Sequence, residues 1–86
     1  MKITKELLIS LKNEAIKRKI DHLRDKHADL IDKLLEKMER EARRGNCYRF
    51  ANLDEYPKEM FEVFEYDGFK VIYPYYPGYK LVEIHF

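Results

Sequence analysis

The chain has 86 residues, of which 45% are apolar, 14% aromatic and 38% charged. This length suits one small domain and excludes a multi-domain enzyme, and the aromatic content is too high for a disordered chain. Its 17 basic and 16 acidic residues leave a net charge of +1, which excludes a polyelectrolyte role for the molecule as a whole.

The composition changes at Gly45. All seven tyrosines, all five phenylalanines, all three prolines and all three glycines follow Arg44. Residues 1–44 carry 13 basic and 9 acidic side chains, whereas residues 45–86 carry 4 basic and 7 acidic ones. We expect a single domain, 1–86, with a basic helical arm, 1–44, and an acidic, aromatic α+β half, 45–86.

Residues 5–44 have the pattern of a helix. From Leu8 onward, apolar side chains recur at steps of three and four, which gives one continuous stripe. Thr4 can cap the first turn, with Ile3 and Leu8 as a hydrophobic staple. Gly45 can end the last turn.

The length of this helix raises a packing problem. As one piece it would span about 60 Å, roughly twice the diameter of a small domain. It must either project toward a partner or break into an antiparallel pair, with Asp21, Asp25 or Asp29 capping the second helix. Because no glycine or proline marks a break, the sequence favours a continuous helix.

The apolar stripe contains a seam suited to another helix. At heptad spacing, Lys12, Lys19 and Lys26 border one side of it, and Lys17 and Arg24 border the other. A symmetric two-stranded coiled coil would oppose these like charges, which argues against a simple zipper. The candidate residues for an oligomer or helix seam are Ile9, Ile16, Ile20, Leu23, His27 and Leu30.

The pattern of residues 45–86 predicts a strand, followed by a short helix and then by a hairpin. Residues 47–51 alternate like a short strand, and Pro57 suits the first position of a short helix. Residues 69–86 form a hairpin around a Pro-Gly turn, in which Val71 faces Ile84. With the long helix, this predicts an α+β fold of order α-β-α-β-β, with both helices on one face of a small sheet.

Nothing in the sequence has the pattern of a catalytic or cofactor site. GxGxxG, P-loop, HExxH, CxxC and GxSxG motifs are all missing from it. His22, Asp25 and Asp29 share one helix face, but such a pattern is usually a solvated face. We therefore predict no enzyme, no cofactor and no metal. The single cysteine, Cys47, cannot form an internal disulfide and indicates a reducing, cytoplasmic setting.

Two groups of residues are candidates for partner binding. Tyr75, Tyr76 and Tyr79 cluster at the hairpin tip, where exposed tyrosines are common interface anchors and can also stack on nucleobases. Packing beneath the long helix is the alternative for them. The basic edge Lys12, Lys19 and Lys26 has three candidate counterparts: an acidic protein, a nucleic acid or nucleotide, or the chain's own carboxylates.

Part of the chain resembles small accessory proteins of phages and prophages. The matching pieces are Ala42-Arg43-Arg44-Gly45, Tyr48 to Ala51, Gly68-Phe69-Lys70-Val71, and Tyr79 to Phe86. The resemblance covers about half the chain, and the final Ile-His-Phe departs from its usual Ile-Ser-Trp ending. It implies no catalytic residues. Some such proteins block host defence systems such as CRISPR by binding one component.

The leading hypothesis is a phage-encoded binding protein that docks on a host protein in the host cytoplasm and inhibits it. The alternative is a nucleic-acid or nucleotide binder that uses the basic edge and stacked tyrosines. A structural homo-oligomer held by the seam is the third. No run of apolar residues is long enough to predict a membrane span.

Overall fold

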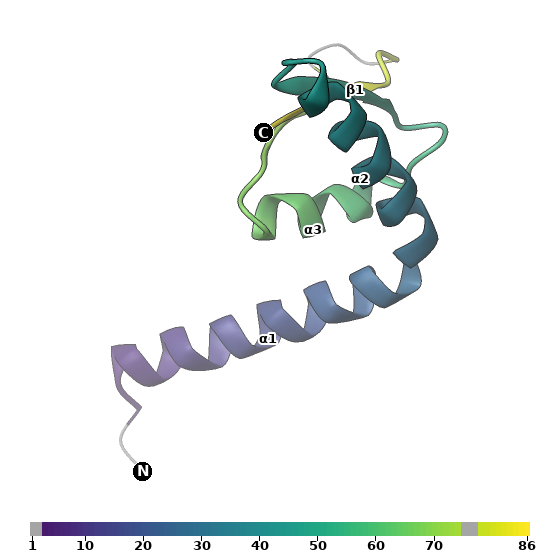
Figure 1. Ribbon diagram of the computed structural model, residues 1–86. Helices are drawn as coiled ribbons and strands as arrows, with labels where there is room; N and C mark the ends of the chain where they lie inside the picture. The colour runs from purple at the N-terminus through teal and green to yellow at the C-terminus, as the bar shows by residue number, and fades with distance from the viewer. Residues whose placement is uncertain (1–2, 75–77) are drawn as a thin grey trace.

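The computed structural model describes residues 3–74 and 78–86 and confirms an α+β fold with a long N-terminal helix (Figure 1). Two helices come first, followed by a strand, a 3-10 turn that leads into a short helix, and a pair of strands. The elements are α1 (Lys5–Lys26), α2 (Ala28–Arg43), β1 (Tyr48–Asn52), η1 (Lys58–Met60), α3 (Phe61–Tyr66), β2 (Lys70–Ile72) and β3 (Leu81–His85).

The predicted continuous helix over residues 5–44 is wrong, because the chain turns at His27. The backbone there leaves helical geometry (φ −114°, ψ 23°), and α2 runs off in a new direction (Figure 1). None of the three aspartates caps α2, since His27 stands at its N-cap position without a side-chain cap. The turn lets both Leu23 and Ile31 reach the same core, which a straight helix of about 60 Å could not do.

The outer ends of the helical pair follow the sequence signals more closely. Thr4 accepts a hydrogen bond from the Leu7 amide at 3.2 Å. At the other end, Gly45 adopts a φ of +85°. Its amide and that of Asn46 donate to the carbonyls of Ala42 and Glu41, which is a Schellman closure. The proposed staple is not formed as a buried contact, because Ile3 and Leu8 are both exposed.

The sheet has three antiparallel strands in the order β1-β3-β2. The predicted hairpin register is confirmed, with Val71 opposite Ile84. The turn residues Tyr76 and Pro77 lie outside the described residues. The predicted strand at 47–51 is β1, shifted by one residue, and it pairs with β3. Pro57 precedes the short helix as its N-cap rather than its first residue.

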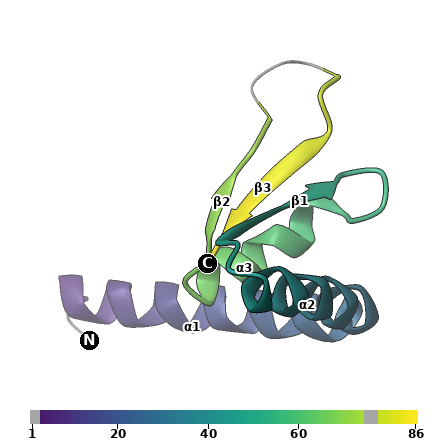
Figure 2. The same cartoon turned by 45° about the horizontal axis from the view of Figure 1, so that its top comes forward.

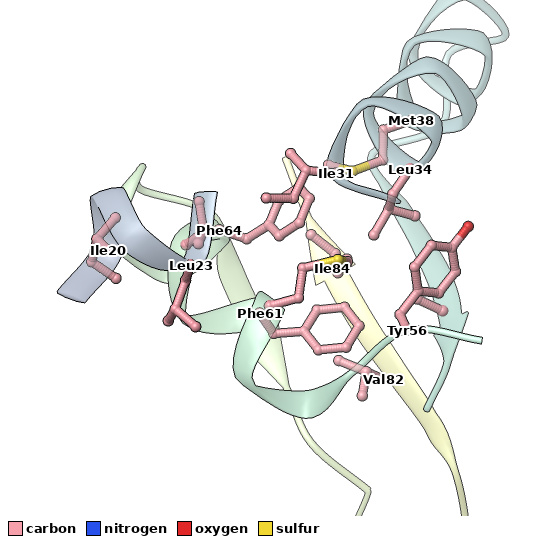
Figure 3. Close-up of a cluster of buried hydrophobic side chains, with 13 residues drawn as sticks. Ile20, Leu23, Ile31, Leu34, Met38, Tyr56, Phe61, Phe64, Val82 and Ile84 are labelled. Atoms are coloured by element: carbon pink, nitrogen blue, oxygen red, sulfur yellow. The ribbon is translucent and has the colours of Figure 1, made fainter. Parts of the chain in front are cut away.

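One hydrophobic core joins α2, α3 and the inner face of the sheet. Figure 3 shows Leu34, Phe61 and Ile84 directed toward a common centre. In Figure 2 the helices gather on one side of the sheet, so its other face is open to solvent. Tyr48 and Phe50 lie on that open face, with their ring centroids 5.6 Å apart.

The molecule is elongated because α1 extends past the core (Figure 1). Its radius of gyration is 15.7 Å and its extents are 54 × 31 × 23 Å, whereas a compact chain of this length has a radius of gyration of about 12 Å. Within the described residues, no helix combines the length and the apolar content needed to cross a bilayer.

Candidate protein-interaction site

The C-terminal half of α1 is fixed to the body of the protein. Ile20 and Leu23 are buried in the core. Around them, ion pairs join α1 to the segment around α3. Arg24 holds Asp67 through two bonds of 2.8 and 2.9 Å, and Lys19 lies 3.1 Å from Glu62. This anchored half sets the direction in which the rest of α1 leaves the core.

The turn at His27 is clamped by a carboxylate of η1. The imidazole Nε2 lies 2.7 Å from Glu59 Oε1, and Lys26 Nζ lies 3.1 Å from the same oxygen. The hydrogen bond from His27, followed by that from Lys26, holds the pKa of Glu59 below its usual value. His27 therefore stands at the turn between α1 and α2, where its imidazole has a hydrogen-bond partner.

The Arg24–Asp67 pair predicts a stability that depends on pH. The hydrogen bonds from Arg24 lower the pKa of Asp67, so its stabilisation is present above the ordinary aspartate pKa and is lost as the pH falls through the lowered value. Both side chains are more than a third exposed, and Asp67→Asn should therefore cost only about 0.5–1 kcal/mol at pH 7.

Urea unfolding at several pH values measures this effect. The gap between the wild type and Asp67→Asn should close as the pH falls below about 4. Asp25→Asn is the control, because Asp25 is exposed and has no ion-pair partner among the described residues. A gap that stays constant down to pH 2 would show that the ionic pair is not its source.

The first two thirds of α1, Lys5–Lys19, carry exposed apolar side chains among charged ones, and we call this segment the α1 arm. Ile9 and Ile16 continue the side of the helix that buries Leu23, while Leu8 and Leu11 lie on other sides of it. The core ends before it reaches any of them. The exposed fractions are 56% for Leu8, 48% for Ile9, 52% for Leu11 and 39% for Ile16.

A shallow groove runs between the α1 arm and the end of α3. Its α1 side is lined by Ile9, Asn13, Lys17 and the two acids Glu6 and Glu14, and Tyr66, which is half exposed, forms the other side. The arm carries five cations, Lys5, Lys12, Lys17, Arg18 and Lys19, but only two acids, Glu6 and Glu14. The ion pairs among the described residues involve Arg18 and Lys19 but none of Lys5, Lys12 and Lys17. The arm therefore combines exposed apolar side chains with a net positive charge.

The structure buries part of the predicted seam and leaves the rest exposed. Ile20 and Leu23 are buried, and Leu30 packs against the core from α2. His27 occupies the turn. Only Ile9 and Ile16 remain exposed. The seam is thus covered by the chain itself from Ile20 onward and open before it.

Part of the predicted basic edge is paired with carboxylates of the chain itself. Lys19 and Lys26 lie beside Glu62 and Glu59. For these two lysines, the chain's own carboxylates are thus the counterpart of the basic edge. Lys12 has no such neighbour among the described residues. The structure therefore leaves less free positive charge on this edge than the sequence suggested.

Of the tip tyrosines, Tyr79 is half exposed, while Tyr75 and Tyr76 lie outside the described residues. Tyr73 packs against the core and donates a hydrogen bond to Glu65. Burial, followed by that hydrogen bond, raises the pKa of Tyr73. The tip and the α1 arm are thus separate candidate surfaces.

Several exposed residues were missed from sequence. Tyr66 was not singled out, because its place beside α1 depends on how α3 packs. Leu8 and Leu11 were assigned to the stripe, although their spacing from Ile9 puts them on other sides of the helix. Within the described residues, no cluster of three metal-binding side chains occurs.

Comparison of the chain with protein-family models, with curated proteins and with solved structures finds no match.

Proposed function

We propose that the protein is a binding protein whose α1 arm docks into an apolar, acid-rimmed groove of another protein. The observation that carries this proposal is the run of exposed Leu8, Ile9, Leu11 and Ile16 on a helix that projects beyond the core. Isolated apolar residues are normal on a surface, but four large exposed apolar side chains within so short a projecting segment indicate an interaction site.

The distribution of these residues favours a groove over a flat surface. Ile9 and Leu11 lie on nearly opposite sides of the helix, so a flat partner could cover only one of them. A groove contacts a helix on more than one side and could cover both. An amphipathic or apolar helix in a groove is also a common mode of protein recognition.

The charge of the arm favours an acidic rim on the partner. Lys5, Lys12 and Lys17 have no carboxylate partner among the described residues. A second copy of the arm would bring the same cations together, which is unfavourable in a helix pair. A heterologous partner with carboxylates around the groove avoids this repulsion.

The resemblance to phage accessory proteins supports a narrower proposal about the partner. We place the protein in the host cytoplasm and its partner in the host's defence machinery, which it would inhibit by binding one component. Nucleic-acid binding is less well supported, because carboxylates lie beside Lys19 and Lys26.

Substitutions in the arm test the proposal. A photoreactive residue in place of Lys12 would capture the partner in an extract of host cells, and the affinity would then be measured with both purified proteins. Ile9→Glu and Leu11→Glu should each weaken binding by about 100-fold, the effect of losing a central apolar anchor. Their melting temperatures should stay near that of the wild type, because both residues are exposed.

Leu35→Glu is the matched control, since Leu35 is an exposed leucine on α2. It should leave the affinity unchanged. Equal affinities of the arm variants and the wild type would overturn the proposal. So would a wild-type dimer in sedimentation whose interface is the arm, or tight, steeply salt-dependent binding to a single-stranded oligonucleotide instead of a protein.

A further inference from the structure

The outer edge of β1 is a second surface that can accept a partner, and it is independent of the α1 arm. β1 pairs with β3 along one edge only, and no other strand within residues 3–74 and 78–86 pairs with it. An edge strand presents backbone donors and acceptors to solvent. Which residues of β1 present them follows from the hydrogen bonds to β3.

The hydrogen-bond pattern places Tyr48, Phe50 and Asn52 on the open edge. The Phe86 amide donates to Cys47 O at 2.9 Å, and the Leu53 amide donates to Lys80 O at 2.8 Å. Residues in an antiparallel ladder alternate between bonding the partner strand and pointing away from it. Because residues 47 and 53 bond toward β3, the backbone groups of residues 48, 50 and 52 point outward.

This edge carries less protection against strand pairing than the opposite edge of the sheet. Natural edges are kept short or carry lysine, proline or bulges. The opposite edge, β2, follows that rule, since it has three residues, includes exposed Lys70 and is followed by Pro74. β1 has five residues, none of which is lysine or proline, and its one charged residue, Arg49, projects beneath the sheet.

A depression of about 330 Å³ runs beside β1. Glu41, Asn46, Tyr48, Arg49 and Phe50 line it. Tyr48 and Phe50 project to the open face of the sheet, whereas Arg49 projects to the other face. Because residues from both faces of β1 contribute and none from β3 does, the depression follows the open edge.

On the face of the sheet that packs on the helices, the basic side chains beside the β1 edge outnumber the acidic ones. Two guanidinium groups, those of Arg49 and Arg44, lie 3.3 and 3.7 Å from the single carboxylate of Glu41. Toward the other end of β1, Lys37 Nζ lies 3.2 Å from the Tyr56 hydroxyl, and the Tyr56 amide donates to Asn52 O. The aromatic side and the cationic side of the edge are thus separated by the strand.

We propose that the outer edge of β1 binds an extended segment of another protein whose side chains alternate between apolar and acidic. Its backbone would bond residues 48 and 50 and the amide of residue 52, whose carbonyl already accepts from the Tyr56 amide, as in other cases of strand addition. Its apolar side chains would cover Tyr48 and Phe50, and its acidic ones would face Arg44, Arg49 and Lys37. A second copy of β1 fits less well, because Arg44 and Arg49 of both copies would meet along the shared edge.

Amide hydrogen exchange with a model peptide tests this site. The probe is a blocked peptide of about ten residues that alternates valine and glutamate, and its control has lysine in place of glutamate. At saturation, the amides of Tyr48, Phe50 and Asn52 should exchange at least about ten-fold more slowly. The amides of Arg49 and Ala51 should change little, because they already face β3.

Two substitutions at Phe50 separate the backbone contact from the side-chain contact. Phe50→Pro removes an outward N–H without removing a bond to β3, and proline is tolerated on edge strands. It should abolish peptide binding, whereas Phe50→Ala, which keeps the N–H, should weaken it by a smaller factor. Equal binding to both variants would overturn the proposed backbone contact.

A charge exchange provides a test that does not depend on Phe50. Arg44→Glu, at a largely exposed position, should weaken binding of the glutamate peptide and strengthen binding of the lysine peptide. The Ile9→Glu variant, which is changed in the α1 arm, should bind the glutamate peptide as the wild type does. This result would distinguish the β1 site from the function proposed for the arm. Equal protection by both peptides, no protection by either, or protection that rises with protein concentration alone would overturn the proposal.

Discussion

Phe61→Ala is expected to lower the free energy of unfolding by about 3–5 kcal/mol, the range for truncation of a fully buried phenylalanine. Phe61 is 0% exposed and packs among Met60, Phe64, Val82 and Ile84. Its ring joins α3 to the sheet, with the Phe64 ring centroid 6.2 Å away. The loss is comparable to the whole stability of a small domain, so a large fraction of the variant should be unfolded at 37 °C.

Phe50→Ala is the matched control for this prediction. It removes the same ring from a position that is 48% exposed, on the open face of the sheet. Its cost should stay below about 1 kcal/mol, since little buried area is lost. Urea unfolding followed by circular dichroism measures both values. Similar losses at the two positions would contradict the assignment of Phe61 to the core.

The elements predicted well from sequence are those whose signals are local. The hairpin register follows from the pairing of Val71 with Ile84 on one face, with Lys70, Glu83 and His85 on the other, because a slip by one residue would move Val71 and Ile84 to opposite faces. Thr4 and Gly45 mark the helical region through their own cap chemistry. Such signals need no knowledge of the rest of the chain.

The break at His27 could not be predicted in this way. No helix-breaking residue stands there, and the periodicity of the stripe continues from Leu23 to Ile31. The turn depends on a core that α1 and α2 share and on Glu59, which is supplied by a distant segment. Tertiary contacts of this kind override local helix propensity.

The candidate interaction site was predicted in part. Ile9 and Ile16 were recognised as seam residues, and the structure leaves them exposed. Tyr66 and the open edge of β1 were not recognised, because both depend on the packing of α3 and on the strand order β1-β3-β2. The spacing of residues along one chain does not specify which strand becomes an edge.

Leu23→Ala is expected to cost about 2–4 kcal/mol, because it opens a cavity at the contact between α1 and the core. Leu23 is buried, whereas Leu11 on the same helix is exposed. Leu11→Ala is therefore the control and should change stability by less than about 0.5 kcal/mol. Both substitutions replace a leucine within the same helix, so the difference measures burial rather than helix propensity.

Hydrogen exchange should show that Leu23→Ala releases α1 before the rest of the protein. Within α1, Ile20 and Leu23 are the buried side chains, whereas β1, β2 and β3 are joined to each other by ladder bonds. Proteins open in units of this kind, with free energies below that of global unfolding. Amides of α1 should therefore lose more protection than those of β3.

Equal loss of protection in α1 and β3 would show that α1 unfolds only together with the sheet. In that case the arm would be a rigid extension of the core, and a partner would meet it already ordered. The expected, separate release of α1 means instead that a partner bound to the arm stabilises α1 by mass action. Binding and the docking of α1 on the core would then be coupled through Ile20 and Leu23.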